Sequence, residues 1–145
     1  MTLRIATQED TEVWAGLRAR LWKDTSLDVH RSEIAELLAR PRGESIAFLE
    51  GVPPRAFAEA SLRRDHVDGC DTSPVAFLEG IYVNPEDRGH GIGRRLLAAV
   101  RDWAREIGCS ELGSDAELAN TASHAFHEAS GFEETSRVVF FRMRL

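Results

Sequence analysis

The sequence predicts an α/β fold of the α+β kind, in which helices flank a sheet that is partly antiparallel and partly parallel. Three strand patterns follow one another at residues 45–50, 55–62 and 75–83, and successive strands usually pair antiparallel. Further along, strand and helix patterns alternate, which indicates parallel pairing through crossover helices. Because no repeat, low-complexity tract or linker divides the chain, residues 1–145 are expected to form one domain.

The N-terminal third is predicted to hold a short strand and two helices. The strand covers Leu3 to Ala6, and Thr7-Gln8-Glu9-Asp10 has the form of a capping box that should open the first helix. A second helix is expected from Arg31 to Arg40. The apolar residues at helical spacing are Val13, Trp14, Leu17 and Leu21 in the first helix, and Ile34, Leu37 and Leu38 in the second.

The rest of the chain alternates between strands and helices. A turn at 51–54 joins the first two strands of the hairpin, and a polar loop at 65–74 precedes the strongest strand pattern, Val75 to Val83. The elements expected after it are a helix from Gly91 to Ile107, a short strand from Glu111 to Asp115, a helix from Asn120 to Ser130, and a final strand or bent pair of strands from Phe132 to Leu145.

Composition narrows the class of partner. The formal net charge is −6 and the pI is near 5.4. This disfavours nucleic acid, which is bound by neutralising phosphates with Lys and Arg, and weakly favours a cationic partner. No apolar run is long enough to cross a bilayer, so no membrane partner is expected, and the N-terminus lacks the pattern of a signal peptide. We therefore expect a cytoplasmic protein, in which Cys70 and Cys109 are reduced thiols.

The stretch NPEDRGHGIGRR, Asn84 to Arg95, has the composition of an anion-binding loop. Its glycines alternate between a strand and a helix, and the helix N-terminus offers unpaired N–H groups and a partial positive charge. Arginines add positive charge in an otherwise acidic chain. The spacing matches neither a Walker loop, which needs a lysine after its glycines, nor the GxGxxG of a dinucleotide-binding turn.

The pair Glu79-Gly80 interrupts the strongest strand. A glycine inside a strand marks a β-bulge or a close approach of backbone. Strict alternation would place Glu79 on one face with Phe77, Ile81 and Val83, where an unpaired carboxylate is costly. A bulge here would redirect the carboxylate and leave backbone N–H and C=O groups free for an extended ligand.

No metal site is expected. His124 and His127 stand three positions apart without HExxH or a further ligand at metal spacing. The aspartates of the 65–71 segment do not follow the spacing of an EF-hand loop.

From Glu79 to Arg95 the sequence resembles the core of the GCN5-related N-acetyltransferases. Their pattern [QR]xxGx[GA], which forms the pyrophosphate loop of coenzyme A, reads here Arg88-Gly89-His90-Gly91-Ile92-Gly93. The resemblance implies the acyl-CoA N-acyltransferase fold, with the sheet splayed at the bulged strand, and acetyl-CoA as co-substrate. The residues that it implies for binding acetyl-CoA are Ile81, Tyr82, Val83, Arg88, Gly89, His90, Gly91, Ile92, Gly93, Arg94 and Asn120.

Over nearly its whole length the chain is similar to the aminoglycoside 6′-N-acetyltransferases. The segment GCDTSPVAFLEGI carries most of this similarity. A polycationic antibiotic fits an acidic chain, because carboxylates attract it. The residues placed on the acceptor side are Trp22, Thr25, His66, Glu79, Asp115 and Ser136. Family members can carry His, Tyr and Glu where this chain has Thr25, His66 and Ser136, so the order of preference among antibiotics is open.

No Ser–His–Asp or Cys–His arrangement is apparent in the sequence, which fits direct transfer without an acyl-enzyme. The backbone N–H of Val83 would donate to the thioester oxygen, and Glu79 or Asp115, directly or through water, would deprotonate the acceptor ammonium. Many relatives carry a tyrosine in the last helix as the acid for the CoA thiolate. His127 stands at that place, and the thiolate could instead leave unassisted.

Structural alternatives stay open for three of these residues. Glu79 could be paired with an arginine, Asp115 could cap the next helix, and Trp22 could belong to the core. At the level of the whole protein, the alternatives are an acetyltransferase for another amine (a polyamine, a small metabolite or a protein N-terminus), an acetyl-CoA-binding module without catalysis, and a partner-binding domain without a ligand. The resemblance suggests a homodimer formed through the strand Val138 to Leu145.

Overall fold

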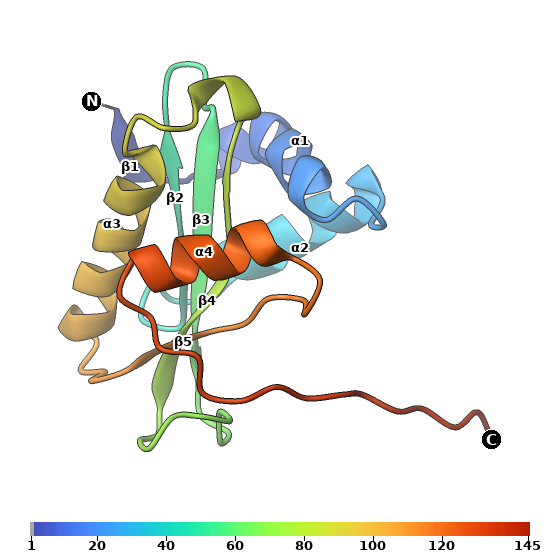
Figure 1. Ribbon diagram of the computed structural model, residues 1–145. Helices are drawn as coiled ribbons and strands as arrows, with labels where there is room; N and C mark the ends of the chain where they lie inside the picture. Colours follow the sequence, from blue (N-terminus) through green and yellow to red (C-terminus); the bar gives the residue numbers. More distant parts are fainter. Residues whose placement is uncertain (1) are drawn as a thin grey trace.

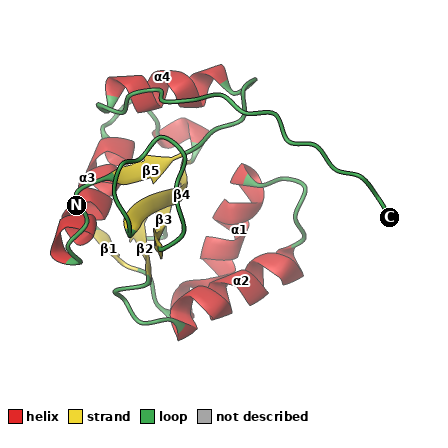
Figure 2. Cartoon of the chain, turned by 90° about the horizontal axis from the view of Figure 1, so that it is seen from below, coloured by secondary structure: helices red, strands yellow, loops and turns green. Residues whose placement is uncertain are grey.

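A computed structural model describes residues 2–145 and consists of a twisted sheet with helices on both faces (Figures 1 and 2). Its strands are β1 (Leu3–Ile5), β2 (Ser45–Glu50), β3 (Ala56–Arg63), β4 (Val75–Val83) and β5 (Leu112–Ser114). Its helices are α1 (Thr11–Leu21), α2 (Leu27–Ala39), α3 (Ile92–Glu106) and α4 (Thr121–Ala129), with 3₁₀ turns η1 (Gln8–Asp10) and η2 (Pro85–Asp87). The strands lie in sequence order, antiparallel from β1 to β4 and parallel between β4 and β5. This confirms the mixed sheet.

Side-chain alternation along the strands separates two apolar cores. On one face, the small residues Ala56, Ala58 and Ala60 of β3 lie under α3, whose apolar stripe includes Leu96 and Trp103. On the other face, α1 and α2 cover a second cluster that includes Trp14, Ile34, Leu49 and Phe57. Burial of each large apolar side chain stabilises the fold by roughly 1.5–3 kcal/mol. This packing fixes α3 to the sheet, and with it the glycine loop at the N-terminus of α3.

The predicted bulge is present in β4. Glu59 pairs with Gly80 while its neighbour Ala60 pairs with Leu78, so the register skips Glu79. As a consequence the face pattern of β4 shifts by one residue after the bulge. Phe77 and Glu79 lie on the face covered by α1 and α2, whereas Ile81 packs against the α3 core.

Two helices differ from the sequence prediction in detail. Helix α2 begins at Leu27 rather than Arg31, because the Ser26 side chain accepts a hydrogen bond from the Val29 N–H and caps the helix there. In α1 the buried stripe runs through Trp14, Leu17 and Arg18, and the predicted core residue Val13 is 42% exposed.

The predicted strand or pair of strands from Phe132 to Leu145 is absent, and this prediction is wrong for the chain in isolation. Residues after α4 have no regular structure and run away from the sheet (Figure 1). The segment after Arg137, the C-terminal tail, exposes its apolar side chains, with Phe140 and Phe141 91% and 92% exposed. A strand needs a partner for its backbone groups, and the isolated chain brings no free strand edge alongside this segment.

Candidate acetyl-CoA and acceptor sites

The glycine loop occupies the turn from β4 into α3. Gly89 and Gly91 adopt φ of +82° and +80°, the left-handed region in which a Cβ is strained. Gly91 is the N-cap of α3 and, because glycine has no side chain, it provides no capping hydrogen bond to the helix. The first N–H groups of α3 have no partner within the helix and point out of its end, so the loop and helix together form an anion-binding turn.

Two arginines line this turn in different ways. Arg95 donates to the His90 carbonyl at 3.2 Å, and its buried Nε has no hydrogen-bond partner among residues 2–145. A buried donor left free beside a helix N-terminus fits an anion such as a pyrophosphate. Arg88 lies over the Tyr82 ring and donates to the Val83 carbonyl at 2.8 Å. Arg88 therefore marks the end of β4, where the acyl end of an extended ligand would arrive.

The sheet opens beyond the bulge, which agrees with the predicted splay. Pairing between β4 and β5 ends at Leu78 and Ser114, and the rest of β4 has no strand on that side. The Asn84 N–H donates to the Arg55 carbonyl of the segment before β3. Because successive N–H groups of a strand point to opposite sides, the Val83 N–H points away from β3, toward the opened edge. This is where a thioester oxygen can be reached.

Helix α4 closes the opened edge. Asn120 caps it by accepting from the Ser123 N–H at 3.2 Å, which leaves the side-chain amide of Asn120 as a donor. His127 lies within 2.7 Å of the Ser123 carbonyl through Nδ1 and within 2.8 Å of the Ser114 hydroxyl through Nε2. Since a carbonyl only accepts, Nδ1 carries the proton, and Nε2 faces the last residue of β5 that pairs with β4.

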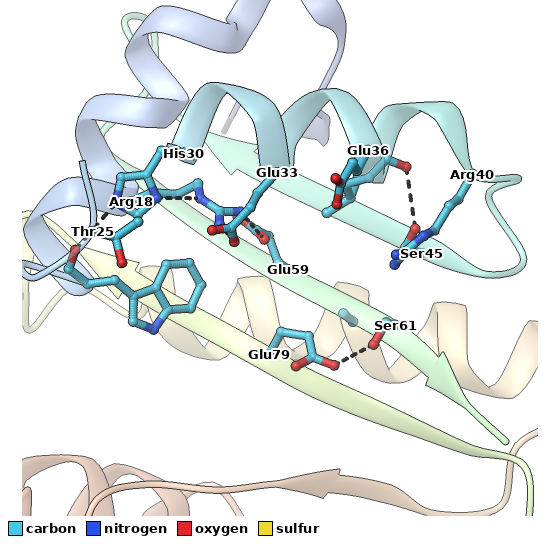
Figure 3. A pocket seen from close by; sticks show the side chains of 13 residues that line it. Arg18, Thr25, His30, Glu33, Glu36, Arg40, Ser45, Glu59, Ser61 and Glu79 are labelled. Atoms are coloured by element: carbon cyan, nitrogen blue, oxygen red, sulfur yellow. Dashed lines mark hydrogen bonds and ion pairs between the residues drawn. The ribbon is translucent and has the colours of Figure 1, made fainter. Parts of the chain in front are cut away.

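A pocket of about 540 Å³ opens on the other face, between α2 and strands β3 and β4 (Figure 3). Three of the residues predicted for the acceptor side, Trp22, Thr25 and Glu79, line this pocket. Its lining includes four glutamates against two arginines, so it favours a cation. The charged lining residues are Arg18, Glu33, Glu36, Arg40, Glu59 and Glu79.

Glu79 is held by two residues of β3. One carboxylate oxygen accepts from the Ser61 hydroxyl and from Arg63 Nε at 3.2 Å, and the other accepts from Arg63 Nη2 at 2.7 Å. The Arg63 guanidinium also lies 3.5 Å from the centre of the Phe77 ring. The pairing of Glu79 with an arginine, left open by the sequence, is therefore present, and Glu79 nevertheless faces the pocket (Figure 3).

A buried ion pair lies beneath Trp22. Arg18 donates to both carboxylate oxygens of Glu59 at 2.6 and 2.8 Å, and Trp14 donates to the same carboxylate at 2.9 Å. Burial raises the pKa of Glu59, while Arg18 and Trp14 favour its ionised form. The pair and its donors hold α1 against the middle of β3.

His30 links this ion pair to Trp22. Arg18 Nε donates to His30 Nδ1 at 3.1 Å, and His30 Nε2 lies 3.3 Å from the Trp22 carbonyl. The Trp22 ring is stacked beside His30 and lies against the backbone of Gly80, where a Cβ would come within 2.5 Å of it. Trp22 thus contacts both the core and the pocket, and Gly80 is required for this approach.

The other three acceptor-side residues lie outside this pocket lining. Asp115, which follows β5, is exposed and makes no side-chain hydrogen bond within residues 2–145. His66 is exposed in the loop before β4, and Ser136 is exposed beyond α4. The loop and this segment meet, because Gly69 lies against Thr135.

Glu111 anchors the same loop. It accepts from the backbone N–H groups of Asp71 and Thr72 at 2.9 and 2.7 Å, and also from the Thr72 hydroxyl. The hydrogen bond from the Thr72 side chain is the main reason that the pKa of Glu111 is lowered. The loop is therefore fixed to the residue that precedes β5.

Sequence reasoning missed the residues that support the pocket. One signal was available, because Glu59 is a carboxylate inside the apolar strand pattern AFAEASL and so had to be paired. Nothing local in the sequence indicated the others, which act through contacts between distant elements. The missed residues are Arg18, His30, Glu33, Glu36, Glu59, Ser61 and Arg63.

Residues 2–145 contain neither a cluster of metal-binding side chains nor a helix suited to span a membrane. Within residues 2–145, His, Cys, Asp and Glu side chains do not gather in groups of three or more that could hold a metal ion. In the same part of the chain, none of the helices has the length and apolar composition that crossing a membrane requires.

Comparison with known proteins places the chain among acetyltransferases. Residues 4–132 match the model of the acetyltransferase (GNAT) family. The aminoglycoside N(6′)-acetyltransferase type 1 of Serratia marcescens is 46% identical over 97% of each chain. That of Stenotrophomonas maltophilia is 48% identical over 99% of this chain and 94% of its own.

Solved structures give the same result. The aminoglycoside N-acetyltransferase AAC(6′)-Iy in complex with CoA superposes with a TM-score of 0.91 at 42% identity, over 99% of this chain and 94% of its own. The same protein is known in complex with the bisubstrate analogue CoA-S-monomethyl-acetylneamine, with a TM-score of 0.90 over 99% of this chain and 97% of its own, at 42% identity. The apo 6′-N-acetyltransferase AAC(6′)-IG of Acinetobacter haemolyticus reaches 0.93 at 38% identity, covering 100% of this chain and 99% of its own.

Proposed function

Because the chain belongs to the acetyltransferase (GNAT) family, we propose that it transfers the acetyl group of acetyl-CoA to the 6′-amine of aminoglycoside antibiotics and so confers resistance to them. In this reaction the amine nitrogen forms a bond to the acetyl carbon, the carbon–sulfur bond breaks, and the amine loses a proton. The observation that carries the proposal is the pocket lined by Trp22, Thr25 and Glu79, with its excess of glutamates. The relatives from Serratia marcescens and Stenotrophomonas maltophilia are named for this activity, and each aligns with this chain over nearly its whole length.

The cofactor side of the site uses backbone groups and arginines. The residues fit coenzyme A, since the α3 N-terminus, the left-handed glycines and the free Nε of Arg95 suit its pyrophosphate. Acetyl-CoA supplies the activated acetyl thioester. Along the opened edge of β4, the backbone at Ile81, Tyr82 and Val83 offers hydrogen bonds to an extended arm, and the Val83 N–H donates to the thioester oxygen. The Asn120 amide donates from the α4 side.

The acceptor side uses carboxylates to hold an ammonium and to remove its proton. Glu79 is the proposed base, because it lies on the bulge and lines the pocket. Asp115, exposed beyond β5, and the side chains of His66 and Ser136 bind the outer amines and hydroxyls of the acceptor. For the leaving thiolate, His127 is the proposed acid: its Nε2 faces the Ser114 hydroxyl at the point where β4 and β5 separate, and it delivers a proton only when Nε2 is protonated in addition to Nδ1.

A coupled thiol-release assay tests the proposal. The purified chain is given acetyl-CoA with a panel of aminoglycosides, such as kanamycin and tobramycin, and of polyamines. Free CoA is expected only when acetyl-CoA and an aminoglycoside are both present, and mass spectrometry should locate the acetyl group on the 6′-amine. Turnover of polyamines but of none of the aminoglycosides would mean that the acceptors are polyamines instead of aminoglycosides. Binding of acetyl-CoA without transfer to any amine would contradict catalysis.

For the assembly, we infer a homodimer in which the C-terminal tail of each chain adds a strand to its partner. Between Val138 and Leu145, alternate residues are apolar (Val139, Phe141, Met143 and Leu145), as in a strand with one buried face. The exposure of these side chains in the isolated chain is costly in water. The remaining inferences are a single domain over residues 1–145, a cytoplasmic location, and no nucleic acid or membrane as partner.

A further inference from the structure

Arg63 donates hydrogen bonds to Glu79, the carboxylate that an acceptor ammonium would need. A carboxylate offers about four lone-pair positions for hydrogen bonds. Ser61 and the two donors of Arg63 use three positions on Glu79. An incoming ammonium carries the same charge as the guanidinium and seeks the same oxygens. The two cations therefore cannot both make their full set of contacts with Glu79.

The position of Arg63 is built into the sheet. Its guanidinium lies on the Phe77 ring with 3.5 Å between its central carbon and the ring centre, in addition to its two hydrogen bonds. Ser61, Arg63 and Phe77 belong to paired segments of β3 and β4, where Ser61 lies opposite Phe77. Glu79, two positions after Phe77 on the same face of β4, points toward this group. At the same time the Arg63 side chain is 42% exposed, so it has room to turn away from Glu79 without being buried elsewhere.

We propose that Arg63 is a specificity-determining residue that holds the place of the acceptor ammonium on Glu79 and is displaced when a polycationic acceptor binds. In the free protein the guanidinium holds the orientation of the Glu79 carboxylate through two hydrogen bonds. On binding, the ammonium takes over the Arg63 hydrogen bonds, and the guanidinium remains over the Phe77 ring or moves into water. An acceptor with several positive charges gains most, because its other amines meet Glu36 and Glu33 in the same pocket, where one oxygen of Glu33 already accepts from Arg18 Nη2 at 2.6 Å and the other is left for the acceptor.

The chain contains a matched control for this contact. Arg64, the next residue, makes an equivalent pair with Glu44, with both nitrogen–oxygen distances at 2.6 Å and side-chain exposures of 63% and 35%. Neither Arg64 nor Glu44 lines the acceptor pocket. Replacing either arginine removes one positive charge from the same end of β3. Only Arg63 is in contact with Glu79, so a difference between the two variants isolates the displacement from general electrostatics.

The inference rests on the proposed function and is tested by steady-state kinetics of Arg63→Met, Arg63→Lys and Arg64→Met with one aminoglycoside. Arg63→Met is expected to lower the acceptor KM about three- to tenfold relative to Arg64→Met, because partly exposed pairs are worth up to about 1 kcal/mol. Arg63→Lys should give a KM between wild type and Arg63→Met, since it keeps the charge but loses the planar fork. The KM for acetyl-CoA should not change.

Calorimetry of the aminoglycoside binding to the CoA complex provides a readout without turnover, and Arg63→Gln replaces Arg63→Met if the latter unfolds. An acceptor KM and Kd for the Arg63 variants that equal those of Arg64→Met, or exceed them, would overturn the role of Arg63. Absence of thiol release by the wild-type protein with every aminoglycoside would instead overturn the proposed function. In that case calorimetry with a polyamine still decides whether Arg63 competes with cations.

Discussion

Glu79 and Gly80 show at the scale of single residues how one irregularity in a strand serves two sides of a site. Glu79 shares the face of Phe77 and points to Ser61, Arg63 and the pocket, whereas the skipped register moves Ile81 to the α3 face and opens the edge of β4. The absence of a side chain at Gly80 admits the Trp22 ring to the backbone of β4. Both effects come from single residues rather than from the acidity of the whole chain. Single substitutions can therefore test them.

Replacing Glu79 by Gln should lower kcat/KM for the aminoglycoside by about 100-fold or more, because a positioned base contributes on the order of 10²–10⁴ in rate. Glu44→Gln is the matched control, since Glu44 is also paired with an arginine but lies outside the pocket. Rates are measured by thiol release at saturating acetyl-CoA. If Glu79→Gln and Glu44→Gln behave alike, Glu79 is a structural carboxylate and Asp115 is the next base to test.

Replacing Gly80 by Ala should raise the acceptor KM and destabilise the fold by roughly 1–3 kcal/mol, as overpacking does. The added Cβ would come within 2.5 Å of the Trp22 ring, which is held in place by His30 and Arg18. The control is Gly16→Ala in α1, where a Cβ meets nothing within 4 Å. Acceptor kinetics and urea unfolding measure the two effects. An unchanged acceptor KM would separate Trp22 from the acceptor site.

At the scale of elements, the loop between β4 and α3 shows how a helix terminus becomes a binding site. Helix α3 is fixed to the sheet by its apolar stripe over the alanines of β3. The left-handed glycines then direct the backbone N–H groups outward without a Cβ in the way. The helix provides direction and partial charge, and the loop provides close access.

Gly91→Ala should raise the KM for acetyl-CoA about tenfold and leave the acceptor KM unchanged. Alanine at φ of +80° carries roughly 1–2 kcal/mol of strain, and its relief would move the N–H groups of the loop. Gly108→Ala is the control, because Gly108 has φ of +86° at the other end of α3 and a Cβ there meets nothing within 4 Å. Equal effects of the two variants on acetyl-CoA would mean that strain, rather than the loop, is responsible.

At the scale of the whole molecule, charge pairs couple stability to pH, and the proposed dimer makes a role for the tail testable. Hydrogen bonds from Arg4 lower the pKa of Asp10 to about 2, and the Arg55 side chain lowers that of Glu50. Both carboxylates therefore stabilise the fold above their unfolded pKa near 4, and this contribution is lost as the pH falls toward 2. Glu59 has the opposite sign, because burial raises its pKa.

Stability to urea should therefore decrease between about pH 4 and pH 2. Asp10→Asn should cost about 1 kcal/mol at pH 7, after allowance for the exposure of Arg4, and should reduce the slope over that range. Asp102→Asn serves as the control, because its pair with Arg105 is 3.5 Å long and exposed. A pH dependence that Asp10→Asn leaves unchanged would exclude Asp10 as its source.

Removing the C-terminal tail, by ending the chain after Arg137, should convert the dimer to a monomer in sedimentation equilibrium. Phe141→Asp is expected to weaken the dimer in the same direction, because Phe141 is 92% exposed in the isolated chain and belongs to the apolar set of the tail. Val52→Asp is the control, since Val52 is equally apolar, 82% exposed and distant in sequence. A monomeric wild-type protein would refute the proposed assembly.

Most of what is local could be read from the sequence alone. The strands Ser45–Glu50 and Val75–Val83, the bulge at Glu79-Gly80 and the glycine loop all follow from periodicity and from residues with special backbone freedom. The tail was the exception, because its alternating pattern predicts a strand but the pattern cannot say which chain provides the partner. The start of α2 was missed because the cap at Ser26 is a weak signal.

Only the tertiary structure decided which side chains surround the acceptor pocket. Trp14 and Glu59 share a hydrogen bond although they are 45 positions apart in the sequence. Arg63 on β3 likewise pairs with Glu79 on the neighbouring strand β4. Such contacts depend on strand register and on how helices cross the sheet, and no short window of sequence contains that information. The sequence by itself determined the order of elements as far as α4 and the residues able to do chemistry. The folded chain determined which charges meet, since charge pairing acts through space rather than along the chain.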